Sequence, residues 1–150
     1  MSSYTAYPPL HTAEHLLTRL IHERLPTLQD FNTRLKSRKA VLSFAYDGDV
    51  AEADREALEA AAQEIVDAAL PVTTSYLPRE EAETRLPNLH QVPEDADPVR
   101  VVRIGEGDCL VDERACIGTH VANTSEIHDL RLTTLRQEEP GRWRINLVVG

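Results

Sequence analysis

Two pairs of potential metal ligands stand out in this sequence, and each pair is spaced four residues apart. His11 and His15 lie in HTAEH, and Cys116 and His120 lie in CIGTH. On a helix, residues four apart emerge on one face about one turn apart, so the first pair can present two imidazole nitrogens to a single ion. Three imidazoles and one thiolate form a borderline-soft donor set that suits Zn²⁺. The four residues predict one zinc site, provided that the fold brings the two pairs together.

The spacing alone leaves the role of such a site open. HTAEH differs from the HExxH pattern of zinc proteases, because Thr12 stands where that pattern places its general-base glutamate. Four protein ligands close a tetrahedral shell, which is typical of a structural zinc, whereas catalysis needs an open or expandable position. The residues therefore fit two classes of protein: a metal-dependent enzyme, and a non-catalytic zinc-stabilised module that binds a partner.

The remaining histidines and the second cysteine are expected to stay outside the site. His22 follows His11 by about three turns of the predicted helix, too far along the axis to share an ion. His90 falls in a polar loop and His128 begins a predicted strand, so both are interpreted as surface or packing residues. Cys109 stands in the apolar stretch DCLV and is predicted to be a buried core thiol.

Length and composition indicate one globular domain over residues 1–150. The chain is 41% hydrophobic and 27% charged, which is ordinary for a globular protein. No apolar run approaches the ~20 residues that a membrane helix needs. The N-terminal MSSYTAYPPL lacks the basic-then-apolar layout of a signal peptide. These features predict a cytoplasmic protein that does not enter a membrane.

The net charge of −9 bears on possible partners. A protein this acidic does not attract nucleic acid through its overall field, so RNA binding would need a local basic patch. Two stretches are candidates, and the alternative for both is a solvated surface. They are RLKSRK, with Arg34, Lys36, Arg38 and Lys39, and the C-terminal hairpin, with Arg131, Arg136, Arg142 and Arg144.

Hydrophobic periodicity and turn residues predict an α+β domain. We expect a two-layer sandwich in which two main helices pack on one face of a largely antiparallel sheet. Asp49 is the predicted N-cap of the second helix. Leu130 and Leu132 are expected to share one side, and the core-facing residues of the last strand are Trp143, Ile145, Leu147 and Val149. The predicted elements are helices at 10–24, 51–69 and 78–85, strands at 40–46, 72–77, 99–104 and 108–113, a polar loop at 87–98, and a hairpin of 128–137 with 142–149.

Both ligand motifs resemble those of a known family. HTAEHLL resembles the HTATHLL motif of the alanyl-tRNA synthetase editing domain, and CIGTHVANTSEI resembles its CGGTHVxNTGEI motif. LSFAYDGD and VRVVRIGEGD are similar to strands of the same domain. The likeness extends over about residues 10–136. The threonyl-tRNA synthetase editing domain is a more distant match, because its second motif typically reads CRGPH.

The resemblance implies a free-standing alanyl-tRNA editing protein with the α+β fold of that domain, because the motif order begins near the N-terminus. Such a protein is a zinc-dependent aminoacyl-tRNA deacylase that acts in trans, in the cytoplasm, on the acceptor end of tRNA(Ala) mischarged with serine or glycine. A hydrolase of another small ester on the same fold is a further alternative.

The resemblance also implies roles for individual residues. His11, His15, Cys116 and His120 become the ligands of one Zn²⁺ per chain. Thr12 falls beside the metal, where its hydroxyl is expected to position the substrate and to discriminate a serine side chain. Gly118 and Thr119 fall on the Gly-Thr that lines the substrate site. The sequence departs from the family pattern at Ile117 and Ser125, which both replace glycine.

Overall fold

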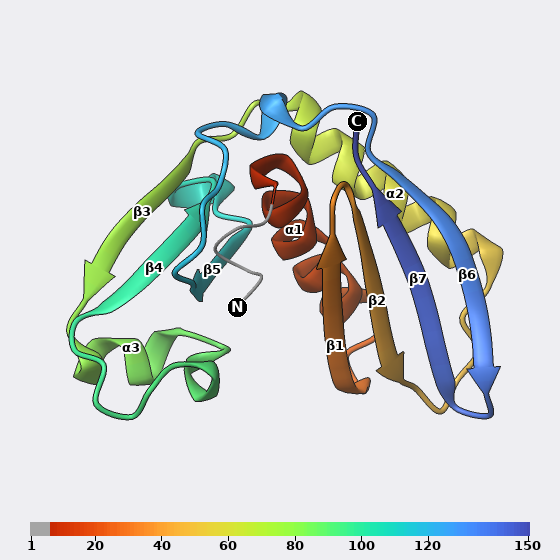
Figure 1. The fold of residues 1–150 in the computed structure, drawn as a ribbon, viewed down its shortest axis with the longest axis horizontal. Helices are drawn as coiled ribbons and strands as arrows, with labels where there is room; N and C mark the ends of the chain where they lie inside the picture. The colour runs from red at the N-terminus through yellow and green to blue at the C-terminus, as the bar shows by residue number, and fades with distance from the viewer. Residues whose placement is uncertain (1–6) are drawn as a thin grey trace.

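The chain folds into two antiparallel sheets that splay apart on either side of its first helix (Figure 1). The structure, a computed structural model, describes residues 7–150. The helices are α1 (Pro8–Arg24), α2 (Glu52–Asp67) and α3 (Arg79–Arg85), and short 3₁₀ turns are η2 (Leu89–Gln91), η3 (Gly107–Cys109) and η4 (Thr124–Glu126). The strands are β1 (Gln29–Lys36), β2 (Lys39–Ala45), β3 (Val72–Leu77), β4 (Val99–Ile104), β5 (Asp112–Ala115), β6 (Arg131–Glu139) and β7 (Arg142–Val148).

The predicted α+β class with antiparallel pairing is confirmed. One sheet has the order β1-β2-β7-β6, and the other has the order β3-β4-β5. The strands thus divide between two sheets, whereas the sequence suggested one. Alternation reveals which face of a strand is buried but not which strand lies beside it.

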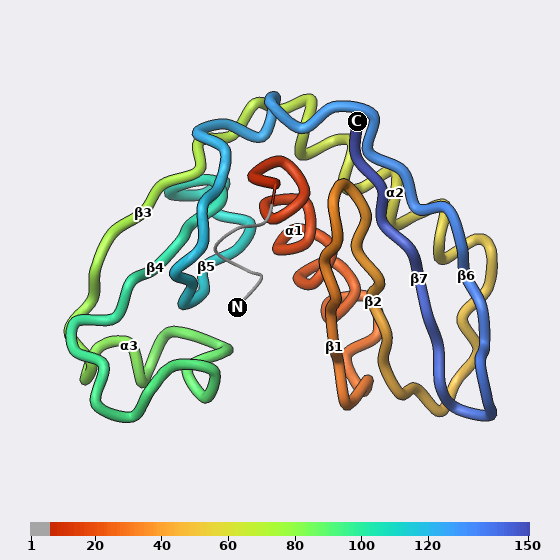
Figure 2. The backbone as a smooth tube through the Cα atoms, in the orientation of Figure 1, coloured from red at the N-terminus to blue at the C-terminus, as the bar shows by residue number. Residues whose placement is uncertain are grey.

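Two connections carry the chain between the sheets, and they run side by side (Figure 2). The first follows α2, and the second contains η4. Leu70 and Thr124 hold them together, since the backbone N–H of Thr124 donates to the carbonyl of Leu70 (2.9 Å) and the Leu70 N–H donates to Thr124 Oγ1 (2.9 Å). A β-bridge between Pro71 and Asn123 continues this contact. The two halves are therefore joined by backbone hydrogen bonds as well as by α1.

Helix α1 forms where a helix was predicted and is buried on several sides. Pro8 lies in the first turn, where its missing N–H costs nothing. Leu10, Leu16, Leu17 and Ile21 have no exposed surface. Because these side chains are fully buried on one side of the helix, they fix its rotation, and this rotation decides where the histidines of the same helix point.

Helix α2 covers the four-stranded sheet and runs behind β6 and β7 in Figure 1. Its buried stripe is Leu58, Ala62 and Val66, at helical spacing. The prediction that Asp49 caps this helix was wrong. The N-cap is Ala51, whose N–H donates to the Asp54 carboxylate at 2.8 Å. The first-turn carboxylate takes the role expected of a capping side chain.

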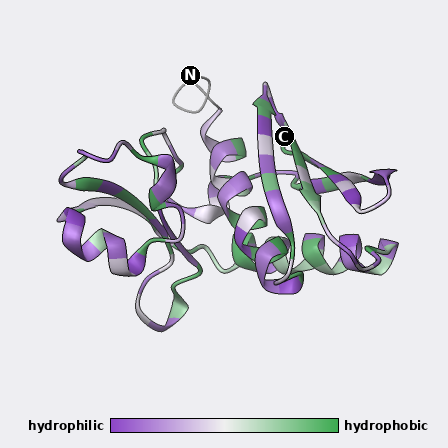
Figure 3. Cartoon of the chain, turned by 90° about the horizontal axis from the view of Figure 1, so that it is seen from below, coloured by the Kyte–Doolittle hydropathy of each residue, from purple (hydrophilic) through white to green (hydrophobic). Residues whose placement is uncertain are grey.

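The packing of the C-terminal hairpin is confirmed. Trp143, Ile145, Leu147 and Val149 are buried, and Leu130 and Leu132 are buried beside them. Hydrophobic and hydrophilic residues alternate along the strands, so one face of the large sheet is apolar (Figure 3). A second, smaller core lies under the three-stranded sheet and is formed by Leu77, Ala82, Leu86, Val99, Val101 and Ala115.

Three local features differ from the sequence-based expectation. Strand β1 was not predicted, because Phe31 and Leu35 are its only large apolar residues and it lies at a sheet edge. Cys109, predicted to be buried, is exposed and belongs to the turn η3. The following strand, predicted over residues 108–113, is instead formed by Asp112–Ala115. Among the described residues, no helix is both long and apolar enough to cross a membrane.

Candidate metal centre

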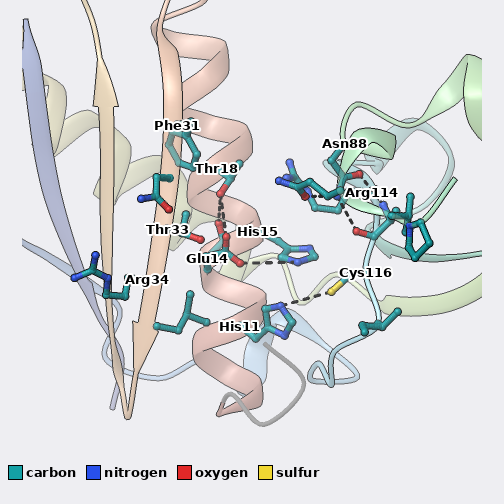
Figure 4. A pocket seen from close by; sticks show the side chains of 17 residues that line it. His11, Glu14, His15, Thr18, Phe31, Thr33, Arg34, Asn88, Arg114 and Cys116 are labelled. Carbon is teal, nitrogen blue, oxygen red and sulfur yellow. Dashed lines mark hydrogen bonds and ion pairs between the residues drawn. The ribbon is translucent and has the colours of Figure 1, made fainter. Parts of the chain in front are cut away.

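The four predicted ligands meet between α1 and the segment that follows β5. Figure 4 shows three of them, His11, His15 and Cys116. His11 and His15 project from one face of α1, and both are buried. Cys116 comes directly after β5, and His120 follows on the same loop. One ligand atom from each residue lies within 4.8 Å of the other three. The fold therefore assembles two motifs that are about 100 residues apart in the chain.

The interatomic distances fit a tetrahedral zinc. Cys116 Sγ lies 3.5 Å from His11 Nε2 and 3.5 Å from His120 Nε2. Zinc bonds of about 2.3 Å to sulfur and about 2.0–2.1 Å to nitrogen, set at the tetrahedral angle, place the two ligand atoms about 3.5 Å apart. These two spacings match the shell that zinc prefers, and all four donor atoms lie within 4.8 Å of one another.

Hydrogen bonds on the far side of two rings fix which nitrogen faces the thiol. His11 Nδ1 lies 3.1 Å from the carbonyl oxygen of Thr119, which can only accept, so this nitrogen carries the proton. His120 Nδ1 lies 2.9 Å from Thr12 Oγ1. In both rings Nε2 is therefore the nitrogen turned toward Cys116. Such outer partners orient metal-binding histidines and set their tautomer.

His15 is the third imidazole, and its buried Nδ1 has no hydrogen-bond partner among residues 7–150. Asp112 Oδ2 lies 3.8 Å from that nitrogen, and Glu14 Oε1 lies 3.9 Å from Nε2 on the other side of the ring. A buried polar atom without a hydrogen-bond partner is uncommon in folded proteins, and a role as a metal ligand is one physical reason for it. This observation is independent of the distances to Cys116.

Burial tunes the acid–base state of the cluster. Desolvation lowers the pKa of His11, lowers that of His15 well below its usual value, and lowers that of His120 to about 3. Neutral imidazole is the form that binds metal, so all three rings are ready ligands at neutral pH. Desolvation raises the pKa of the Cys116 thiol. Metal binding must then displace the thiol proton, which couples affinity to pH.

The loop that carries Cys116 is held by side chains from other elements. Arg100 Nη1, on β4, donates to the carbonyls of Cys116 (2.8 Å) and Gly118 (2.9 Å). Asn88 makes a two-point contact with the residue before the cysteine: its Nδ2 donates to the Ala115 carbonyl, and its Oδ1 accepts from the Ala115 N–H, both at 2.8 Å. These contacts hold the thiol at the end of β5.

A cleft of about 520 Å³ opens onto the cluster. His11, His15 and Cys116 form part of its lining (Figure 4), whereas His120 does not. The other contributors come from α1, from β1 and from the segments around η2 and β5. They include Glu14, Phe31, Thr33, Leu35, Asn88 and Arg114. The metal-ligating atoms thus lie at the wall of a cavity large enough for a small organic group.

The three residues predicted to act on the substrate differ in burial, and all three lie outside the lining of the cleft. Thr12 is fully buried, and its Oγ1 accepts from the N–H of Val121 (3.2 Å) besides contacting His120. Gly118 is buried, and Thr119 is exposed. None of Thr12, Gly118 and Thr119 lines the 520 Å³ cleft, whereas Ile117 does, with 65% of its surface exposed.

Sequence reasoning missed the residues that support the ligands. Asn88, Arg100 and Asp112 each act on the site from a different element, and nothing in their local sequence indicates it. The expected exclusion of His22 is consistent with the structure, where its Nδ1 lies 2.7 Å from the Thr18 carbonyl. His90 and His128 are exposed.

Comparisons with known proteins identify relatives of the chain. The family model of the threonyl and alanyl tRNA synthetase second additional domain matches residues 99–146. An alanine–tRNA ligase of Methanothrix thermoacetophila is 30% identical over 144 residues, which cover 93% of this chain and 15% of the ligase. One from Mycoplasmoides gallisepticum is 26% identical over 141 residues, or 92% of this chain and 15% of the ligase. The chain thus spans about one seventh of these relatives.

These alignments identify the class of protein to which the chain is related. The chain is homologous to the second additional domain region of alanine–tRNA ligases. It also resembles the alanyl-tRNA editing protein Aarsd1 of Danio rerio, with 26% identity over 144 residues that cover 93% of this chain and 33% of that protein. These alignments extend well beyond residues 99–146 and account for nearly the whole chain.

Proposed function

We propose that this protein is a zinc-dependent deacylase that hydrolyses tRNA(Ala) mischarged with serine or glycine, acting in trans on tRNA charged by a separate synthetase. The observation that carries the proposal is the opening of a His₃Cys cluster onto a cleft of about 520 Å³. Homology to alanine–tRNA ligases and likeness to an alanyl-tRNA editing protein support the choice of substrate.

The four side chains fit a single zinc ion, and three of them face the cleft. Zinc held by His11, His15, Cys116 and His120 would polarise an ester carbonyl or lower the pKa of a bound water. The walls of the cleft are partly apolar, through Phe31 and Leu35, and partly polar. This lining suits the 3′ end of a tRNA that carries a small amino acid.

Thr12, Gly118 and Thr119 complete the proposed site, but they act through the ligands. Oγ1 of Thr12 is hydrogen-bonded to His120 Nδ1 and holds that ring, so Thr12 is a positioning residue. The carbonyls of Gly118 and Thr119 hold Arg100 and His11, respectively.

A second candidate is a zinc-stabilised module that binds a partner without catalysis. The specific observation in its favour is the number of protein ligands, because four side chains complete a tetrahedral zinc shell. Hydrolysis of another small ester is a third possibility, because fold and metal site together do not determine a substrate.

Deacylation assays separate these functions. The protein is incubated with seryl-, glycyl-, threonyl- and alanyl-tRNA(Ala), with and without a chelator, and its zinc content is measured. We expect loss of serine and glycine from tRNA(Ala), retention of alanine, and inhibition by the chelator. Cys116→Ala should lower both zinc content and activity. Stoichiometric zinc without hydrolysis of any aminoacyl-tRNA would favour the binding module.

A further inference from the structure

The two basic stretches of this acidic chain lie on one surface. Register across the four-stranded sheet places Arg34 opposite Val41, Val41 opposite Asn146, and Ser43 opposite Arg144. These residues point away from α1 and α2, because the intervening Leu42 is buried in the core beneath the helices. We call this the outer face. Register places seven cations and Glu139 on it, and Glu138 lines a depression there; Asp30, in a bulge of β1, is counted with these acids. The cations are Arg34, Lys36, Lys39, Arg131, Arg136, Arg142 and Arg144.

Charge is strongly segregated between this face and the rest of the molecule. Seven cations and three carboxylates give the outer face a formal charge of +4. Because the whole chain carries −9, the remainder carries −13. A local field of this sign on an otherwise acidic protein selects an anionic partner and orients it toward one side.

The cations of the outer face are also distinguished by their lack of partners. Eight of the sixteen Lys and Arg residues have a carboxylate within 4.0 Å, and seven of these eight lie elsewhere: Arg19, Arg24, Arg55, Arg79, Arg85, Arg103 and Arg114. On the outer face only Arg144 has one, through Glu138 at 3.1 Å. Within residues 7–150, the other six cations of this face have no ion pair, so their charge is available to a ligand.

The face is continuous with the metal cleft. A shallow depression of about 150 Å³ on the sheet is lined by Asn32, Arg34, Val41, Ser43, Glu138 and Arg144. Asn32 and Arg34 also line the 520 Å³ cleft, because β1 forms the edge between the two surfaces. A flexible chain bound across the sheet can therefore pass over β1 and reach the metal cluster.

We propose that the outer face binds the phosphate backbone of RNA and directs the 3′ end over β1 into the cleft; this inference rests on the proposed function. Lys36 on β1 and Arg136 on β6 lie at opposite edges of the sheet, three strand spacings (about 14 Å) apart across it. They are also displaced along the strands, because the register places Arg131, not Arg136, opposite Lys36, so the two cations can neutralise separate phosphates. An anionic membrane is disfavoured as partner. Its binding needs inserted apolar side chains, and the exposed large hydrophobic residues Tyr76, Leu110 and Ile117 lie outside this face.

Binding of an uncharged RNA hairpin with a single-stranded 3′ tail tests the inference without relying on catalysis. Fluorescence anisotropy is measured between about 50 and 200 mM salt. The double variant K36Q/R136Q removes two positive charges from the outer face. R24Q/R85Q is the matched control, since it removes two charges from elsewhere and leaves Glu113 paired with Arg103 (2.5 Å). Thermal melts establish that both variants fold.

We expect K36Q/R136Q to lower RNA affinity about tenfold at low salt. The slope of log K against log[salt] should become less negative by about 1.5. R24Q/R85Q should behave as wild type. Equal losses in the two variants, absence of salt dependence, or tighter binding to phosphatidylserine vesicles than to RNA would each overturn the inference. If RNA binding follows the prediction but no aminoacyl-tRNA is hydrolysed, the proposed function fails alone. If hydrolysis occurs with KM unchanged in K36Q/R136Q, this inference fails alone.

Discussion

At the scale of single residues, the site depends on hydrogen bonds that lie one step away from the ligands. His11 and His120 can each bind a metal ion through Nε2 only if Nδ1 carries the proton, and a buried Nδ1–H needs a hydrogen-bond acceptor. Thr119 supplies a carbonyl for the first ring, and Thr12 supplies a hydroxyl for the second. Threonine at position 12 is thus explained by its two contacts, to His120 and to the N–H of Val121.

Thr12→Val should impair the site as a whole. It leaves the Val121 N–H and His120 Nδ1 without partners, at a cost of about 1–3 kcal/mol in unfolding free energy, and it should weaken zinc binding about 10–100-fold. Because Oγ1 is buried against His120, we expect similar losses of deacylation on seryl- and glycyl-tRNA(Ala). Thr12→Ser keeps the hydroxyl and should retain zinc. A loss confined to seryl-tRNA would instead show that the hydroxyl contacts the substrate.

The lowered histidine pKa values make the stability of the metal-free protein pH-dependent. Burial holds the pKa of His11, His15 and His120 below 6.5, the usual value, which the unfolded chain keeps. Below about pH 6.5 the unfolded state therefore binds more protons than the folded state, so the unfolding free energy falls as pH falls. The slope approaches about 1.4 kcal/mol per pH unit for each histidine.

Urea denaturation of the zinc-free protein at pH 7, 6 and 5 measures this slope. Replacement of His120 by Asn should reduce it, because one of the three buried imidazoles is removed. The pKa of His120 lies at about 3, so its share of the stability loss should persist from pH 6.5 down toward that value. A stability that does not change between pH 7 and pH 5 would contradict the assignment of neutral, buried histidines.

At the scale of elements, β5 is only four residues long, yet it delivers Cys116 to the cluster. Asn88 compensates for this short length by imitating a neighbouring strand, since its side-chain amide pairs with both backbone groups of Ala115. Arg100 then bridges the carbonyls beyond the strand end. The segment is held by side chains where longer strands would use backbone pairing.

Asn88→Leu should release the end of β5. The substitution keeps the volume approximately but leaves two buried backbone groups of Ala115 unpaired, for which we expect a loss of about 2–4 kcal/mol in unfolding free energy and weaker zinc binding. Urea denaturation and chelator competition measure the two effects. His90→Ala is the matched control, since His90 lies in the same 3₁₀ turn η2 with its side chain exposed. Equal unfolding free energy and zinc affinity in the two variants would show that Asn88 does not support the site.

Elements with strong local patterns were predictable, and those defined by distant contacts were not. The spacing of His11 and His15 indicates one helical face, and the apolar alternation of β7 indicates its buried side. By contrast, β1 is an edge strand with little apolar content, so its pairing with β2 is what makes it a strand. The apolar residues around Cys109 suggested that it is buried. Gly105 and Gly107 adopt positive φ in this segment and turn the chain outward. Asn88 and Arg100 act on backbone groups far along the chain, which no local pattern reveals.

At the scale of the whole molecule, the cluster lies where the two halves meet. His11 and His15 belong to the helix that packs against the large sheet, while Cys116 extends from a strand of the small sheet. A metal ion bound there ties α1 to the loop after β5 in addition to the hydrogen bonds between Leu70 and Thr124. The site therefore couples the relative position of the two sheets to metal binding.

Removal of zinc should loosen the protein locally rather than unfold it. A ligand that binds only the folded state stabilises it by RT ln(1 + [L]/Kd), so chelation should lower Tm, and added zinc should restore it. Hydrogen exchange should rise in α1 and in residues 116–127. Strands β2 and β7 lie away from the cluster and pair with each other over seven residues, so they should keep their protection. Cys116→Ala should show the exchange pattern of the chelated wild-type protein, whether or not chelator is added. Uniform exchange across both sheets after chelation would mean that the metal holds the entire fold, and no change in α1 would mean that it does not join the two halves.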